Sequence, residues 1–327
     1  MAAKKRSKKT PAKQKRGLIS RLVRAFCWIC VLALVALGAS YYFGSFETRT
    51  KITDAAKRAL NEARMADWMP KLISSGIDQL YDTVPHSVGL VVDGGELGRT
   101  LSPILAGLPQ SRTPIRVLEN KSYINLYDER TKQPRCIALR LTDADAQKAT
   151  ITQAMFKDPR VAGPSANELT TSGWQATRLA PAAALAKEFG SDGAGEANLS
   201  TNYLPLPSPF IEGLWQEATR TLTQDYPKRF DEVWIYSGPI YDSSSGKLAS
   251  GIRKPSAIYC IAFDLSETGG LRAIAFVLPT NAPTEISLKD CISSIAAIEQ
   301  ASGLSFLPEI GFDARDLLLN WVSPQLW

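Results

Sequence analysis

Histidine, a frequent base and metal ligand of hydrolytic sites, is nearly absent from this 327-residue sequence. His86 is the only histidine, and its apolar-flanked turn, TVPHSVG, is typical of a structural or exposed histidine. The central stretch SGWQATRLAP (172–181) contains Arg178. A guanidinium has a pKa above about 12 and no acceptor atom, so Arg178 could hold a phosphate but could not take a proton.

Carboxylates near this stretch are the other candidates. Glu212 could offer oxygen to a metal ion such as Mg²⁺, which prefers oxygen ligands. Glu168, Asp192 and Glu196 are nearby in sequence, and we interpret them as solvated acids.

The cysteines indicate no zinc site. Cys27 and Cys30 lie inside an apolar run, and Cys136, Cys260 and Cys291 are widely spaced with no histidine near them. Cys136 and Cys260 occupy strand-like apolar runs, which favours buried free thiols. A single disulfide is the alternative that an exported location would permit.

The charge is concentrated at the N-terminus. Residues 1–24 contain six Lys, four Arg and no acid, whereas the whole chain has a net charge of +6. The remaining residues therefore carry −4, which gives no electrostatic support for tight nucleic-acid binding by the body.

An uncharged run follows this basic tail. Residues 25–46, AFCWICVLALVALGASYYFGSF, are long enough to span a bilayer as a helix. We expect 1–24 to be a cytoplasmic tail, 25–46 a single-pass membrane anchor and the rest an extracytoplasmic body, because basic flanks stay inside. The alternative is a cleaved signal peptide with its apolar core at 31–37.

The body divides into two parts. Residues 47–110 predict a helical stalk and an irregular linker, and residues 111–327 predict one α+β domain. We expect an antiparallel meander over 115–141, a helix over 214–226, and strands at 232–242, 256–265 and 271–279. Ser287 predicts a helix cap, with the helix running to about Ala301 and stopping at Gly303. The segment SDGAGE (191–196) predicts a flexible loop.

The order of short segments resembles the DNA/RNA non-specific endonucleases, a ββα-metal family that includes endonuclease G. The resemblance covers about residues 115–307 and implies a ββα-metal nuclease-like domain with a central antiparallel sheet. It rests on VLENKSYINLYDERTKQPRCIALRL, FKDPRV, TNYLPLPSPFIEGLWQEA, SGPIYD, AFVLPTN and IAAIEQASGLSFLPEI, in that order.

The same resemblance implies that the active site is degenerate. The family's motif reads Asp-Arg-Gly-His before Leu-Ala-Pro, and the four positions before Leu179 are Gln175, Ala176, Thr177 and Arg178. The general-base position is thus Arg178. The family's metal-ligating asparagine precedes a tryptophan by four residues, which places Ile211 at that position before Trp215. We expect Arg178 and Ile211 to face one shallow cleft.

Three functions remain open at this point. The first is a membrane-anchored pseudonuclease that has no cofactor and binds nucleic acid or a partner. The second is a divergent metal-dependent nuclease that uses Mg²⁺, with Glu212 as a substitute ligand. The third is an envelope structural or assembly protein.

Overall fold

The computed structural model describes residues 91–93, 102–143, 147, 149–243, 245–266, 270–283 and 285–327. The expected tail, the membrane anchor at 25–46, most of the stalk and linker, and His86 lie outside these residues. Within them, no helix has the length and hydropathy needed to cross a bilayer.

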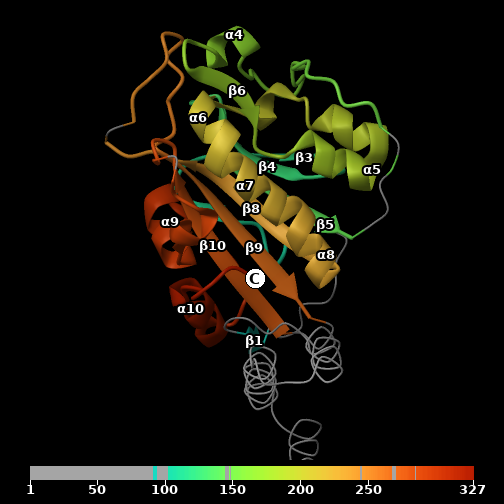
Figure 1. Cartoon of the computed structure of the whole chain (residues 1–327), viewed down its shortest axis with the longest axis vertical. Coiled ribbons are helices and arrows are strands. Elements are labelled where there is room, and N and C mark those ends of the chain that lie inside the picture. Colours follow the sequence, from blue (N-terminus) through green and yellow to red (C-terminus); the bar gives the residue numbers. More distant parts are fainter. Residues whose placement is uncertain are drawn as a thin grey trace, which may run out of the picture. The chain divides into compact units, whose positions relative to one another are not determined.

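One antiparallel sheet forms the centre of the fold (Figure 1). Its strands lie in the order β1-β10-β9-β8-β5-β4-β3, with the short strand β11 paired to β10. Their bounds are Val91–Asp93 (β1), Arg116–Glu119 (β3), Ile124–Asp128 (β4), Gln133–Thr142 (β5), Glu232–Ile240 (β8), Ala257–Leu265 (β9), Gly270–Pro279 (β10) and Ile292–Ser293 (β11). Two small sheets flank it, β2 (Gln110–Ser111) with β12 (Leu304–Ser305), and β6 (Trp174–Arg178) with β7 (Tyr203–Pro207).

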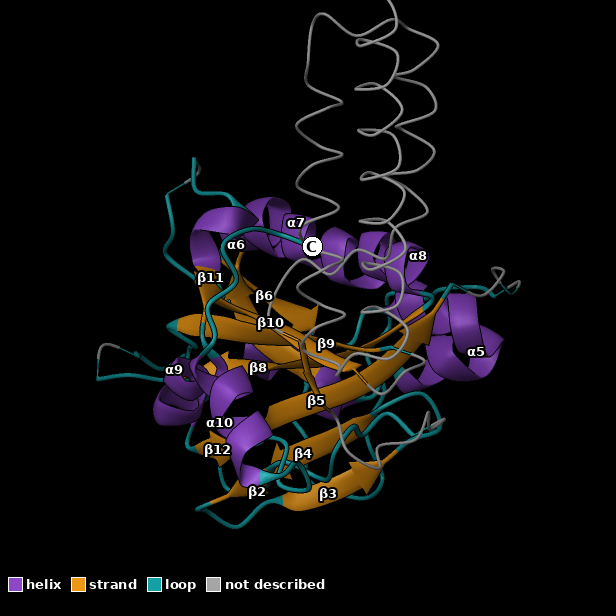
Figure 2. Cartoon of the chain, turned by 90° about the horizontal axis from the view of Figure 1, so that it is seen from below, coloured by secondary structure: helices purple, strands orange, loops and turns teal. Residues whose placement is uncertain are grey.

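Both faces of the central sheet are covered, as Figure 2 shows. One face packs against a long helical segment composed of α6 (Ser208–Phe210), η2 (Ile211–Trp215), α7 (Gln216–Arg220), η3 (Thr221–Asp225) and α8 (Tyr226–Phe230). The other face packs against α9 (Ile295–Ser302) and α10 (Phe312–Asn320). Burial on both faces explains why the central strands are almost continuously apolar rather than alternating. The α+β class and the central antiparallel sheet are confirmed.

The strand predictions agree with the pairing. The meander forms as β3-β4-β5, and β8, β9 and β10 pair in sequence. The apolar runs of these strands lie in the core: Val277 is half-buried, and the buried residues include Val233, Trp234, Ile235, Ile258, Ile261 and Ala275.

Two helix predictions and one loop prediction need correction. The helix expected over 214–226 extends from Ser208 to Phe230, and its segments η2 and η3 are π-helical. The segment 191–196 is the end of helix α5 (Ala182–Glu196), which is kinked at Gly190, where φ is +61°. Ser287 does cap a helix, but only the short η4 (Leu288–Cys291), because β11 then pairs with β10. Helix α9 begins separately at the cap residue Ser294 and ends at Gly303, as expected.

Candidate functional site

Strands β6 and β7 pair across a connection that contains helix α5, and we call this two-stranded unit the β6–β7 hairpin. It includes most of the stretch SGWQATRLAP, and β7 leads directly into the long helical segment. In this hairpin Arg178 pairs with Tyr203, and Thr177 pairs with Leu204. Because side chains alternate across a strand, Arg178 and Tyr203 share one face, which we call the outer face. Thr177 and Leu204 share the other, inner face.

The two faces have different surroundings. On the outer face, Trp174, Ala176 and Tyr203 pack in a small cluster with Leu169, Met155, Leu248 and Ile252. On the inner face, Leu204 and Leu206 belong to the main core, against which Ile211 also packs. The outer cluster is separate from the main core, so the hairpin divides two environments.

Arg178 is held on the outer face by neutral oxygens. Its Nη2 donates to the carbonyl oxygen of Thr152 at 2.9 Å and to Oδ1 of Asn198 at 2.5 Å. Its Nη1 donates to Oε1 of Gln153 at 3.1 Å. The guanidinium carbon lies 5.3 Å from the centroid of the Tyr203 ring, a cation–π distance. Arg178 therefore fixes the segment 152–153 against the end of β6.

The inner face has a different bridge between strand and helix. Nε2 of Gln175 donates to Oγ of Ser208, the first residue of α6, at 2.8 Å. Ile211 is half-buried, and Glu212 is exposed with no ion pair among the described residues. Strand alternation directs Arg178 to the outer face, whereas Ile211 packs on the main core, and this argues against the expectation that the two face one cleft.

The side chains present do not fit the family's metal. Ile211 has no ligand atom, and its hydrocarbon side chain packs on the core. The described part of the chain has no group of three His, Cys, Asp or Glu side chains that could hold a metal ion. Glu212, the proposed substitute, belongs to no such group of three there. We derive no chemical step through a metal at this position.

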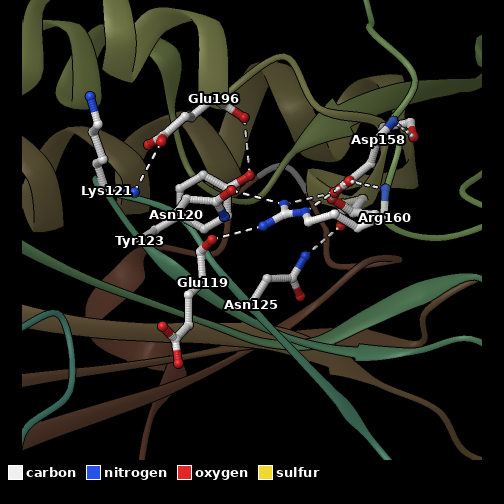
Figure 3. Close-up of polar contacts among 10 residues, drawn as sticks. Glu119, Asn120, Lys121, Tyr123, Asn125, Asp158, Arg160 and Glu196 are labelled. Atoms are coloured by element: carbon white, nitrogen blue, oxygen red, sulfur yellow. Dashed lines mark hydrogen bonds and ion pairs between the residues drawn. The ribbon is translucent and has the colours of Figure 1, made fainter.

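A polar cluster that we did not predict from the sequence fixes the segments around β6 (Figure 3). Asp158 is fully buried and forms a two-pronged ion pair with Arg160, at 2.9 and 2.8 Å. Oγ1 of Thr201 also donates to Asp158, and Arg160 donates to the carbonyl oxygen of Glu119 and to Oδ1 of Asn120. The cluster thus ties the segment 156–160 to the β3–β4 turn and to η1 (Ser200–Asn202), which precedes β7.

Glu196 extends the same cluster. Its carboxylate accepts hydrogen bonds from the backbone N–H groups of Lys121 and Ser122, each at 2.9 Å, and its carbonyl accepts from the hydroxyl of Tyr123. Our interpretation of Glu196 as a solvated acid is therefore wrong. Asp192 does pair with Lys121 at an exposed position, and Glu168 caps the short helix α4 (Ala166–Leu169). The two-residue spacing of Asp158 and Arg160 around a proline is the sequence pattern that could have indicated this ion pair.

The three cysteines of the described domain are buried and free, as expected. Burial raises the pKa of Cys136 to about 12 and that of Cys291 to about 11. These thiols therefore stay protonated at neutral pH, and none of them is a candidate nucleophile.

Comparison with known families supports the resemblance read from the sequence. The family model for DNA/RNA non-specific endonuclease matches residues 107–311, well over half of the chain. The chain belongs to the DNA/RNA non-specific endonuclease family. Within this family fold, the β6–β7 hairpin carries the motif positions on a strand and the helical segment carries Ile211.

Two mitochondrial nucleases are similar to this family member. Nuclease EXOG from Xenopus laevis is 25% identical over 224 residues, covering 61% of each chain. Nuclease EXOG from Mus musculus is 27% identical over 230 residues, covering 63% of this chain and 61% of its own. The chain thus spans about three fifths of the length of these relatives.

A solved structure shares the family fold. The crystal structure of an EndoG/EndoGI complex, described as showing the mechanism of EndoG inhibition, aligns with a TM-score of 0.55 and 17% identity. The alignment covers 62% of this chain and 89% of the other. At this identity, the likeness supports the fold alone.

Proposed function

We propose that this chain is a pseudonuclease: it keeps the DNA/RNA non-specific endonuclease fold, lacks hydrolytic activity, and acts by binding nucleic acid through its phosphates. The observation that carries the proposal is the state of the two motif positions. Arg178 stands at the general-base position with its guanidinium committed to three neutral oxygens. Ile211 stands at the metal-ligand position and is packed on the core.

The chemistry of phosphodiester hydrolysis supports this proposal. A base that removes a proton from the attacking water contributes about 10² to 10⁴ in rate, and a guanidinium cannot do so. The inner face, between β6 and the helix, presents Gln175, Thr177, Ser208 and Ile211. None of these side chains changes protonation near neutral pH. These four side chains of the inner face therefore offer no rate-enhancing acid or base.

Membrane attachment is part of the same proposal. Residues 25–46 would anchor the chain, with 1–24 in the cytoplasm and the nuclease-like domain outside it. The support is the uncharged run beside ten basic residues. Protease added outside intact membranes should then digest the domain and leave a tail-sized fragment. Full protection of the domain would contradict this topology.

The function is tested by measuring binding and hydrolysis together on the full chain in detergent. Fluorescence anisotropy of labelled single-stranded DNA and RNA, with Mg²⁺ present, reports binding, and a denaturing gel of the same samples reports cleavage. We expect binding that weakens as salt rises, because phosphate contacts release counterions, and intact strands on the gel. The absence of salt-dependent binding would contradict the proposal and favour a structural or assembly role.

A further inference from the structure

We propose that Arg178, Asn198 and Tyr203 form a phosphate-binding site on the outer face of the β6–β7 hairpin, and that the segment 151–154 occupies it when no ligand is bound. The inference rests on the proposed function, since it names where the phosphate of a nucleic acid would sit. The site lies on the face opposite Ile211, and so away from the family's metal-ligand position.

The charge of Arg178 is the first argument. Two other half-buried arginines, Arg140 and Arg315, have the carboxylate partners Glu232 and Glu299. Arg178 has no carboxylate partner in the part of the chain that the structure describes, and its three acceptors are neutral. A partly desolvated cation without a counter-charge favours an anion, and a guanidinium matches phosphate with two parallel N–H bonds.

Unused donors are the second argument. Asn198 is fully buried, and while its Oδ1 accepts from Arg178, its Nδ2 has no hydrogen-bond partner among the described residues. The Nε of Arg178 is buried and unpartnered in the same way. Buried donors without partners are rare because each costs free energy. Phosphate oxygens would satisfy both groups.

Tyr203 completes the donor set. Its ring lies beneath the guanidinium, at 5.3 Å from the guanidinium carbon. Burial raises the pKa of Tyr203, and this outweighs the opposing effect of Arg178, so the hydroxyl stays protonated at neutral pH. The site therefore offers donors and a fixed positive charge, and it offers no carboxylate that would repel a phosphate.

The segment 151–154 has the features of a replaceable occupant. Its four residues are exposed and form no helix or strand. The carbonyl oxygen of Thr152 and Oε1 of Gln153 take the positions that two phosphate oxygens would take on the guanidinium. The chain becomes fixed again at Phe156, which exchanges backbone hydrogen bonds with Asn198 and Ser200. Displacement therefore exchanges two bonds to neutral acceptors for bonds to an anionic phosphate, which matches the guanidinium in charge and in its paired acceptor geometry.

Three substitutions in the full chain test this site. Gln153→Ala weakens the occupant without touching Arg178, Asn198 or Tyr203. Arg178→Gln removes the charge, and Arg178→Lys keeps it but loses the forked donors. Arg220→Gln is the matched control, since Arg220 is an exposed helical arginine 3.7 Å from Asp225. The probes are inorganic phosphate, followed by thermal shift at matched ionic strength, and a labelled single-stranded oligonucleotide, followed by anisotropy.

The results below are expected if the segment 151–154 occupies the site in the absence of ligand. Gln153→Ala should tighten binding of both probes about threefold, since the ligand no longer has to displace the side-chain hydrogen bond to Gln153. Arg178→Gln should weaken binding at least tenfold, Arg178→Lys should be intermediate, and Arg220→Gln should match the unmodified chain. Hydrogen exchange at the amides of 152–154 should accelerate when phosphate is added. Circular dichroism establishes that each variant is folded.

The outcomes separate the two proposals. Unchanged or weaker binding in Gln153→Ala, or full binding in folded Arg178→Gln, would overturn the site. If the oligonucleotide binds independently of Arg178, the site fails and the proposed function stands. If inorganic phosphate binds through Arg178 and no nucleic acid binds, the site stands and the proposed function fails.

Discussion

Arg178 and Tyr203 lie directly opposite each other in the β6–β7 hairpin, with the guanidinium 5.3 Å from the ring centroid. This pairing directs the side chain at the general-base position away from the helix that carries Ile211. Positions 178 and 211 keep the order that the two motif positions have in the family, but their side chains lie on opposite sides of the β6–β7 hairpin. Under the pseudonuclease proposal, the residue types at these two positions and the directions of their side chains both argue against hydrolysis.

Restoring the family's residue types should therefore not restore hydrolysis. In Arg178→His combined with Ile211→Asn, the imidazole would lie on the outer face beside Tyr203, out of reach of position 211. The variant that also carries Gln175→Asp, Ala176→Arg and Thr177→Gly should remain inactive for the same reason, since position 176 shares the face of position 178. Plasmid relaxation in Mg²⁺ or Mn²⁺ is the measurement. Metal-dependent relaxation by the restored chain would show that position 178 reaches the helix side.

The ion pair between Asp158 and Arg160 should be important for stability. Removing one partner of a buried pair costs about 3–5 kcal/mol, and because the Arg160 side chain is 31% exposed we expect about 2–3 kcal/mol for Asp158→Asn. Urea unfolding at pH 7 measures this loss. Glu129→Gln, in the half-exposed pair with Arg116, is the control and should cost less than about 1 kcal/mol. Equal losses in the two variants would contradict this role for the cluster.

The same carboxylate predicts a pH dependence. Burial raises the pKa of Asp158, but hydrogen bonds from Arg160 and Thr201 and the charge of Arg160 outweigh it, so the pKa is lowered. An acid whose pKa is lower in the folded than in the unfolded state stabilises the fold above its unfolded value of about 3.9, and this stability is lost as the pH falls through the folded value. The difference in unfolding free energy between the unmodified chain and Asp158→Asn should therefore be constant above about pH 5 and shrink below about pH 4. A difference that persists undiminished to pH 2 would contradict this assignment.

Gly238 is a position in β8 where no side chain fits. A Cβ there would lie 2.2 Å from the carbonyl oxygen of Arg135 and 2.6 Å from the hydroxyl of Tyr259, two atoms that hydrogen-bond to each other. We expect Gly238→Ala to destabilise the domain by about 3 kcal/mol, combining overpacking and a lost hydrogen bond. Gly246→Ala is the matched control, because its nearest neighbour is Cδ of Lys254 at 4.0 Å. Thermal unfolding gives the melting temperature of each variant. Similar melting temperatures for Gly238→Ala and Gly246→Ala would contradict the expected destabilisation.

The sequence predicted the central sheet well because its strands are continuous apolar runs bounded by turns. The predictions from sequence were wrong where contacts with distant segments determine the local secondary structure. The glycines of SDGAGE suggested a loop, but Gly193 lies in a helix, where its missing side chain allows close approach to the carbonyl oxygen of Leu185. The cap at Ser287 was found, but the end of the helix was not, because Ile292 leaves the helix to pair with Phe276.

For the site, spacing located the motif positions but could not give the direction of their side chains. That direction depends on the register between β6 and β7, in which Arg178 meets Tyr203. The polar cluster around Asp158 joins segments up to 76 residues apart, as in the bond from Asn125 to Thr201, and no local pattern shows such contacts.

Hydrolysis by the unmodified full chain is the most direct test of the central claim. Plasmid DNA and RNA are incubated with the chain in Mg²⁺ or Mn²⁺, with parallel samples in chelator and with Glu212→Ala. We predict no cleavage above the no-protein control in any sample, because Arg178 cannot act as a base and Ile211 cannot bind a metal. Cleavage that disappears both with chelator and in Glu212→Ala would contradict the pseudonuclease proposal and establish a metal-dependent nuclease with a rearranged ligand set.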